Sequence, residues 1–132
     1  MNSQSYVGRI YKTFTANNAT AQPVFTITLP NYACEVRFKI EGSTKNTFAY
    51  SFDPKYNVPE LIPNEIMFDN TFYTISPDST RSGIGGTQCT QEIVWRHAEG
   101  MPNALFIICT TAASANQQIL SYSIIGGKNN GY

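Results

Sequence analysis

The residues that could carry hydrolytic chemistry in this 132-residue chain are one histidine and a few acids near the ends of predicted strands. His97 ends the stretch EIVWRH on the same face as Ile93 and Trp95, and a catalytic triad would need the fold to bring a serine or cysteine beside it. A glycosidase would need two carboxylates facing each other across a cleft, and the acids in suitable places are Asp53, Asp69, Asp78 and Glu99. Ordinary surface acids occupy the same places, and a histidine beside a tryptophan at a strand end more often packs than catalyses. The sequence therefore favours a protein that is not an enzyme.

The sequence also lacks the residue spacings that are typical of metal sites and phosphate-binding loops. Cys34, Cys89 and Cys109 are an odd number with no CxxC spacing, and with one histidine they do not predict a zinc site. The run SGIGG (82–86) lacks the Lys-Ser/Thr of a phosphate-binding loop, and no DxDxDG calcium loop occurs. We expect no cofactor and no metal. We expect all three thiols to be reduced, which is typical of folding in a reducing cytoplasm.

The charge balance disfavours nucleic acid and membrane partners. Nine Lys and Arg residues offset nine Asp and Glu residues, and no basic cluster is present to displace counterions from a phosphate backbone or an anionic bilayer. The start MNSQSYVG has no basic segment followed by an apolar run, so we expect no signal peptide and folding in a host cytoplasm. The longest apolar run, ALFIIC (104–109), has the length of a strand rather than of a membrane span.

The composition and the spacing of turn residues predict an all-β protein. Asn, Thr, Ser and Gln make up 42 of the 132 residues, and the 13% of aromatic residues argue against disorder. Expected strands cover 6–15, 24–29, 33–41, 47–53, 66–69, 71–76, 89–97, 104–111 and 118–125. Loops are expected at 17–23, 54–65 and 77–88, and 110–120 is the one place for a short helix. We predict a single domain over 1–132, an antiparallel β-sandwich of about eight strands that is jelly-roll-like, with an arm at 1–7 and a flexible tail at 126–132.

The stretch CEVRFKIE (34–41) alternates between apolar and charged residues without a break. Such alternation is typical of an antiparallel strand with one solvent-facing side, and it fixes the register because a one-residue slip would bury the charges. The charged side chains are Glu35, Arg37, Lys39 and Glu41. Two interpretations stay open for their face: a solvated outer strand, blunted by charge if it lies at an edge, or a polar contact with another protein.

Three aromatic residues alternate along a second predicted strand, namely Phe48, Tyr50 and Phe52. Aromatic side chains in a row can form a platform for sugar rings, but they dominate core burial far more often. We expect them to lie in the core.

The strands VFTITL, CEVRFKIE and ILSYSII, with the Asn- and Thr-rich loops between them, resemble those of small β-sandwich or jelly-roll virion structural proteins. The nearest class is that of phage capsid decoration (cement) proteins and spike or fibre bases. This resemblance implies a homo-oligomer, often a trimer, that binds the major capsid protein or another virion protein and stabilises the particle by adhesion. The implied contacts are the two termini, the loops 54–65 and 77–88, and the charged face formed by Glu35, Arg37, Lys39 and Glu41.

The alternative hypothesis is a carbohydrate-binding module or a lectin-like receptor-binding domain. It would use aromatic residues in loops or at strand ends, for which Tyr56, Tyr73 and Trp95 are the candidates, with Asn and Asp as partners for sugar hydroxyls.

Overall fold

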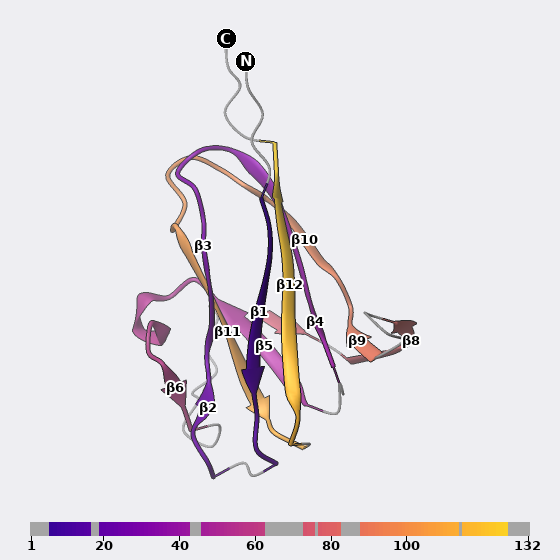
Figure 1. The fold of residues 1–132 in the computed structure, drawn as a ribbon. Coiled ribbons are helices and arrows are strands. Elements are labelled where there is room, and N and C mark those ends of the chain that lie inside the picture. Colours follow the sequence, from indigo (N-terminus) through magenta and orange to yellow (C-terminus); the bar gives the residue numbers. More distant parts are fainter. Residues whose placement is uncertain are drawn as a thin grey trace.

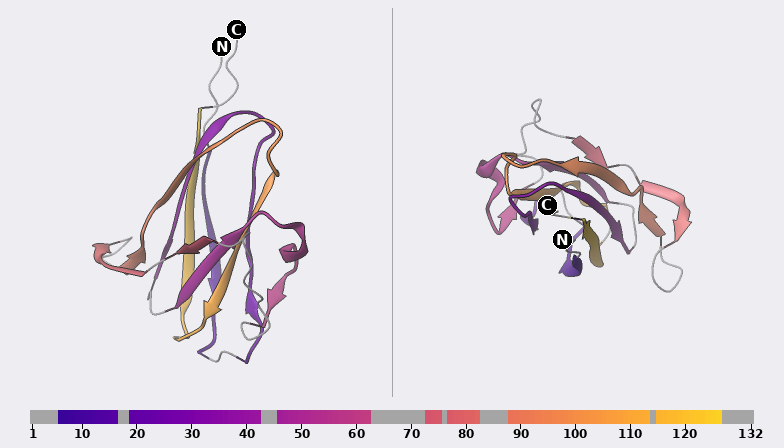
Figure 2. Two further views of the ribbon diagram at one scale, coloured as in Figure 1. Left: turned by 180° about the vertical axis from the view of Figure 1, so that it is seen from behind. Right: turned by 90° about the horizontal axis from the view of Figure 1, so that it is seen from above.

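Antiparallel strands in two layers form the protein (Figures 1 and 2). The computed structural model describes residues 6–16, 19–42, 46–62, 73–75, 77–82, 88–113 and 115–126. The strands are β1 (Tyr6–Thr13), β2 (Gln22–Pro23), β3 (Phe25–Thr28), β4 (Cys34–Glu41), β5 (Thr47–Ser51), β6 (Glu60–Leu61), β7 (Tyr73–Ile75), β8 (Pro77–Ser82), β9 (Gln88–Thr90), β10 (Ile93–His97), β11 (Ala104–Thr111) and β12 (Gln117–Ile125). Within the described residues the only helix is the single 3-10 turn η1 (Pro54–Tyr56).

The larger sheet has six strands in the order β1-β12-β4-β9-β8, and β10 also pairs with β4. The smaller sheet has four strands in the order β3-β11-β5-β7, and β2 and β6 form a separate two-stranded ladder. All the ladders are antiparallel. The prediction of an all-β antiparallel sandwich is therefore confirmed.

The core lies between the two sheets and follows the predicted alternation. In β3, Phe25 and Ile27 are buried while Thr26 and Thr28 are exposed. The same period in β4 buries the apolar positions, and the principal core cluster takes side chains from both sheets. Strand β11 is buried over Leu105–Cys109 without alternation, as expected for a strand covered on both faces. Its second cover is a smaller cluster in which Phe106 and Ile108 pack with Val24, Tyr56 and Leu61.

The expected strand 89–97 forms two short strands, β9 and β10, because it contains one residue more than the stretch of β4 with which it pairs. Glu41 pairs with Cys89, whereas Phe38 pairs with Ile93, so three steps along β4 match four steps along β9 and β10. This is the register shift of a β-bulge, and it separates the two short strands at residues 91–92. The backbone amide of Ile40 lies at the shift and donates to the side chain of Thr90, Oγ1, at 3.0 Å.

Several sequence-based boundaries were wrong. Residues 77–82, expected in a loop, form β8, which pairs with β9. Residues 54–61, also expected in a loop, contain η1 and β6, and β6 pairs with β2 inside the expected loop 17–23. The helix considered for 110–120 does not form, because its described residues belong to β11, the turn after it and β12. Tyr6 and Val7, which the expected arm 1–7 shared with the expected strand 6–15, belong to the strand and pair with Ile124 and Ser123. The expected strand 66–69 lies outside the described residues.

Aromatic rings fill the space between the sheets at the side where β10 faces β5 and β7. Tyr50 stacks on Trp95 with ring centroids 6.2 Å apart and on Tyr73 at 5.1 Å. Phe38 and Phe52 meet the Trp95 ring edge-on at 5.7 and 5.8 Å. The expectation that Phe48, Tyr50 and Phe52 are core residues is confirmed, since Phe48 is fully buried and the other two pack against the core.

Candidate functional site

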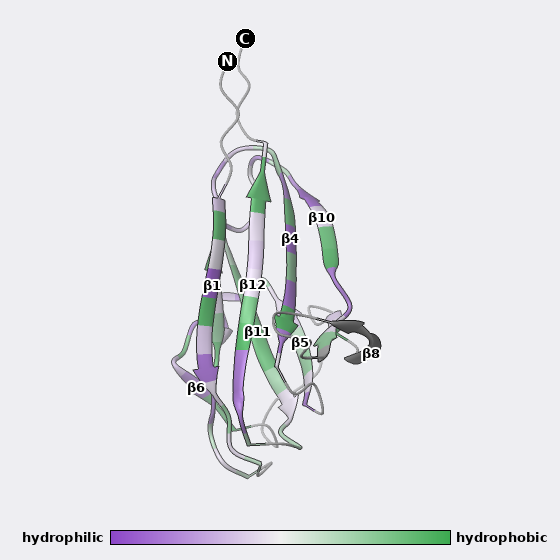
Figure 3. Cartoon of the chain, turned by 45° about the vertical axis from the view of Figure 1, so that its right-hand side comes forward, coloured by the Kyte–Doolittle hydropathy of each residue, from purple (hydrophilic) through white to green (hydrophobic). Residues whose placement is uncertain are grey.

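The outer face of the six-stranded sheet is the first candidate site, because four paired strands present their second set of side chains there. The ladders set Val7, Ser123, Arg37 and Val94 side by side in one row across β1, β12, β4 and β10. The next row along the strands holds Ile125, Glu35 and Arg96. Figure 3 shows the resulting alternation of hydrophilic and hydrophobic residues along β4 and its neighbours.

The outer face carries exposed apolar side chains among its charges, and we define it by the outward positions of β1, β12, β4 and β10. Six large hydrophobic residues of the described chain are substantially exposed, and four of them lie on this face: Val7 at 83%, Tyr11 at 54%, Val94 at 50% and Ile125 at 41%. Arg37, Lys39 and Ser121 line a shallow hollow of about 150 Å³ between Val7 and Glu92. The face therefore carries exposed apolar side chains beside charged ones, and Ser123 and Arg37 separate Val7 from Val94.

The four charged residues predicted for β4 behave differently from one another. Glu35 and Arg37 form an ion pair at 2.9 Å, and the hydrogen bond to Glu35 raises the pKa of the Arg37 guanidinium above its usual value. Lys39 is partly exposed on the same face. The expectation that Glu41 lies on the solvent side is wrong. Glu41 is 2% exposed, and its carboxylate accepts a hydrogen bond from the Ser121 hydroxyl.

Strand β4 is an interior strand of the sheet, so the interpretation as an edge blunted by charge is wrong. It pairs with β12 on one side and with β10 and β9 on the other. Its charges do not protect an edge against pairing. They lie near the middle of a wide surface, where a partner could contact them.

The three aromatic residues predicted for glycan contact do not come together. Tyr56 is 5% exposed and packs beneath η1 in the smaller cluster. Trp95 is partly buried on the inner face of β10, and Tyr73 is 51% exposed on β7. Tyr50 lies between these two rings, and only Tyr73 presents substantial surface.

Two of the candidate catalytic residues, His97 and Asp53, make contacts that support the fold. His97 is 1% exposed, and its Nε2 lies 2.9 Å from the Pro30 carbonyl. Cys34 is directly opposite His97 in the β4–β10 ladder, but burial raises the pKa of its thiol, which disfavours the thiolate form. Asp53 caps η1 by accepting from the Lys55 amide at 3.0 Å.

Glu99 is exposed in the turn after β10. Asp69 and residues 83–86 of the glycine-rich run lie outside the described residues, and Asp78 belongs to β8. The described part of the chain contains no cluster of three or more His, Cys, Asp or Glu side chains that could hold a metal ion. Cys34, Cys89 and Cys109 are buried, and none of them forms a disulfide bond.

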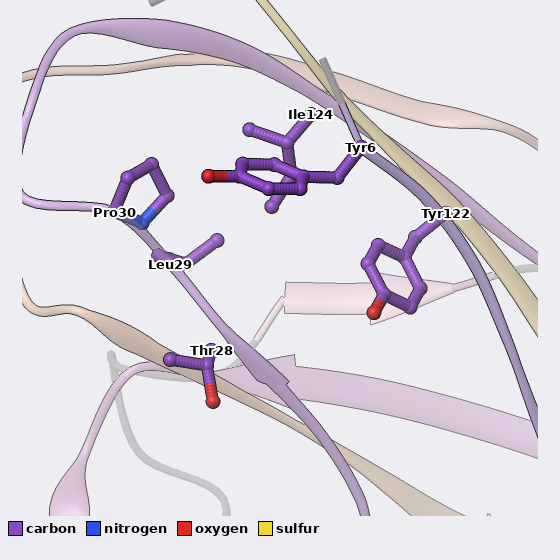
Figure 4. A pocket seen from close by; sticks show the side chains of 6 residues that line it. All are labelled: Tyr6, Thr28, Leu29, Pro30, Tyr122 and Ile124. Atoms are coloured by element: carbon purple, nitrogen blue, oxygen red, sulfur yellow. The ribbon is translucent and has the colours of Figure 1, made fainter. Parts of the chain in front are cut away.

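A pocket at one edge of the sandwich is the second candidate site, and the sequence analysis did not predict it. It has a volume of about 270 Å³ and opens between β1 and β3, the edge strands of the two sheets. Figure 4 shows the residues around it. Its lining is Tyr6, Thr28, Leu29, Pro30, Tyr122 and Ile124. These residues are far apart in sequence, and only the pairing of the first strand with the last one brings them together.

Comparison with known proteins gives no family: no protein-family model and no curated protein matches the chain. Within the described residues, no helix has the length and apolar character needed to span a membrane.

Proposed function

We propose that this chain is a non-enzymatic structural protein of a virus particle, a capsid decoration (cement) or spike-base protein that assembles with copies of itself through the outer face. The observation that carries this proposal is the concentration of exposed apolar side chains on that face. Covering a side chain such as Val7, which is 83% exposed near the start of β1, is favourable by about 25 cal/mol per Å² of apolar surface.

The charges of the outer face suit a contact between identical copies. Glu35 and Arg37 lie within one ion pair, and Arg96, Lys39 and Glu92 surround them. A surface with both signs close together suits a contact between symmetry-related copies, because cations of one part of the face can meet anions of another part on the neighbouring copy. Such charges set the orientation of the contact, while the apolar residues contribute most of its affinity.

The strand order supports a jelly-roll connectivity, which we propose for this sandwich. The path of the chain passes from β1 in one sheet to β3 in the other, back to β4, across to β5 and β7, and then through β10, β11 and β12 in alternate sheets. Jelly rolls occur in viral capsid proteins and in lectins. The fold alone does not choose between these functions, and the exposed outer face favours assembly.

On this proposal the outer face makes the contact between subunits, and other surfaces hold the oligomer to the major capsid protein or another virion protein. In the segment 54–65, expected as a contact loop, Tyr56 and Leu61 also cover β11. Stabilisation of the particle then comes from interface area that is repeated over many copies.

The test is the solution mass of the purified protein by light scattering after size exclusion. We expect a stable oligomer, and a mass near three chains of 14.7 kDa fits the trimer. Val7→Glu with Val94→Glu should give monomers, and so should Arg37→Glu with Lys39→Glu. Thr26→Glu with Thr74→Glu is the matched control for the valine pair, since it adds two negative charges at exposed positions on the other sheet.

A wild-type monomer at tens of micromolar would overturn the assembly proposal. If the oligomer persists in both double variants, the contact lies elsewhere, and the exposed apolar residues of the outer face no longer support the proposal. For the virion setting, the oligomer should cosediment with particles of its source virus, and the monomeric variants should not.

A further inference from the structure

We propose that the pocket between β1 and β3 binds one ring of an uncharged carbohydrate, with the Tyr6 and Tyr122 side chains as its principal contacts. The pocket opens between β1 and β3 and not on the outer face, although Tyr122 also lines the hollow of that face. The odd-numbered residues Val7 and Tyr11 of β1 face outward, whereas Tyr6 pairs with the buried Ile124 and belongs to the inward set.

The chemistry of the lining fits a neutral hydroxylated ring. The six residues that line the pocket carry no charge, so it has nothing to pair with a phosphate, a carboxylate or a cation. Leu29 and Ile124, each 3% exposed, form an apolar floor. Tyr6, Tyr122 and Thr28 add three hydroxyls, and a hydroxyl both donates and accepts hydrogen bonds, as sugar hydroxyls do.

The shape of the site also suits a single ring. Tyr6 and Tyr122 reach it from the β1–β12 side, and Thr28, Leu29 and Pro30 reach it from β3 and the segment after it (Figure 4). Its volume of about 270 Å³ is below the range usual for drug-sized ligands, roughly 300–1,000 Å³. A flat tyrosine ring offers the apolar face against which the C–H face of a pyranose packs.

Two features hold the tyrosine rings in place before a ligand arrives. A hydrogen bond with the Tyr6 side chain favours the neutral form of the Tyr32 phenol. Together with desolvation by burial and the electrostatic interaction with Tyr6, it raises the pKa of Tyr32 to about 12. This bond links the Tyr6 and Tyr32 side chains. Gly8 leaves room for the other ring, since a Cβ added there would lie 2.6 Å from Tyr122 Cε1. Walls that are ordered in advance reduce the entropic cost of binding.

The test is a titration of ¹⁵N-labelled full chain with the methyl glycosides of glucose, galactose and mannose and with N-acetylglucosamine, followed by amide chemical shifts. We expect at least one sugar to bind saturably with a dissociation constant on the order of millimolar. The shifts should centre on Tyr6, Thr28, Leu29 and Tyr122.

Variants separate the site from general effects on the fold. Tyr122→Phe removes one hydroxyl and should weaken binding by about tenfold, while leaving the thermal unfolding midpoint nearly unchanged. Gly8→Ala should weaken binding as well, because the Tyr122 ring must move away from the new methyl group. Tyr73→Phe is the control, because it removes the same hydroxyl from a tyrosine on β7, at the far edge of the other sheet, and it should have no effect.

The proposal is overturned if none of the four sugars binds, or if the shifts map to the outer face or to Tyr73. It is also overturned if a decaproline peptide shifts the pocket amides while the sugars do not, since the aromatic groove would then recognise an extended peptide.

Discussion

The Thr90 hydroxyl replaces a backbone acceptor at the bulge between β9 and β10. Thr90 is fully buried, and its Oγ1 accepts from the Ile40 amide at 3.0 Å and donates to the Gln91 carbonyl at 3.1 Å. Thr90→Val keeps the shape of the side chain and replaces the hydroxyl with a methyl group. The Ile40 amide is then buried without an acceptor.

The size of the effect follows from the two lost hydrogen bonds. An orphaned buried donor costs about 1–3 kcal/mol. The second bond, to a partly buried carbonyl, adds about 0.5–1.5 kcal/mol, and the extra buried methyl group returns about 0.8 kcal/mol. We expect Thr90→Val to lower the free energy of unfolding by about 2 kcal/mol.

The assay is urea unfolding, together with hydrogen exchange of the Ile40 amide. Thr90→Ser keeps the hydroxyl and should cost only about 1 kcal/mol for its lost methyl group, with Ile40 still protected. Thr26→Val, on an exposed position of β3, should change stability by less than about 0.5 kcal/mol. The reasoning is refuted if Thr90→Val falls within that same range, or if the Ile40 amide remains as protected as in the wild type.

Four further outcomes are expected. Phe48→Ala should lower the free energy of unfolding by about 3–5 kcal/mol in urea titrations, because Phe48 is fully buried between the sheets. Tyr56→Ala should cost about 3 kcal/mol and expose the covered side of β11, which dye binding would report. Ser121→Ala should cost about 1–3 kcal/mol, because the buried Glu41 carboxylate loses a donor; thermal unfolding measures it. Burial raises the pKa of the Cys109 thiol from 9.0 to about 12, so the folded state holds this proton more tightly than the unfolded chain does. Stability should therefore fall as pH rises from 9 towards 12, and less steeply in Cys109→Ala.

Alternation in the sequence was sufficient to predict most strands and the inward residues of the sandwich. In β3 and β4 the period of two is complete, and the structure buries the apolar set in both. The unbroken apolar run of β11 belongs to a strand that is covered on both faces. These signals succeed because each is local: a strand needs only its own residues to show which side is apolar.

The errors came from features that depend on distant parts of the chain. Glu41 looks like the other charges of β4, yet its neighbours Cys89 and Ser121 on adjacent strands bury it. The bulge is defined by the number of residues between two pairings on each of two strands, so the sequence of one strand alone does not reveal it. Strand β8 carries the polar residues of a loop and is a strand only because β9 pairs with it.

The candidate sites show the same division. The charged residues of β4 were visible in the sequence, but their apolar neighbours on β1 and β10 became part of one surface only through the strand order. The pocket gave no sequence signal, because Tyr6 and Tyr122 lie at opposite ends of the chain. A glycine facing an aromatic residue in an antiparallel pair, as Gly8 faces Tyr122, is recognised only after the register is known.

The pairing of the first strand with the last has a mechanical consequence. Tyr6 lies opposite Ile124 and Thr13 opposite Gln117, so β1 begins where β12 ends, at the same end of the molecule (Figure 1). A force that pulls the two chain ends apart opens this ladder like a zipper and breaks its hydrogen bonds one after another. Shear along the strands would load the whole ladder at once. The domain is therefore weak when stretched between its ends, and an assembly that bears load would have to grip it across the faces of its sheets.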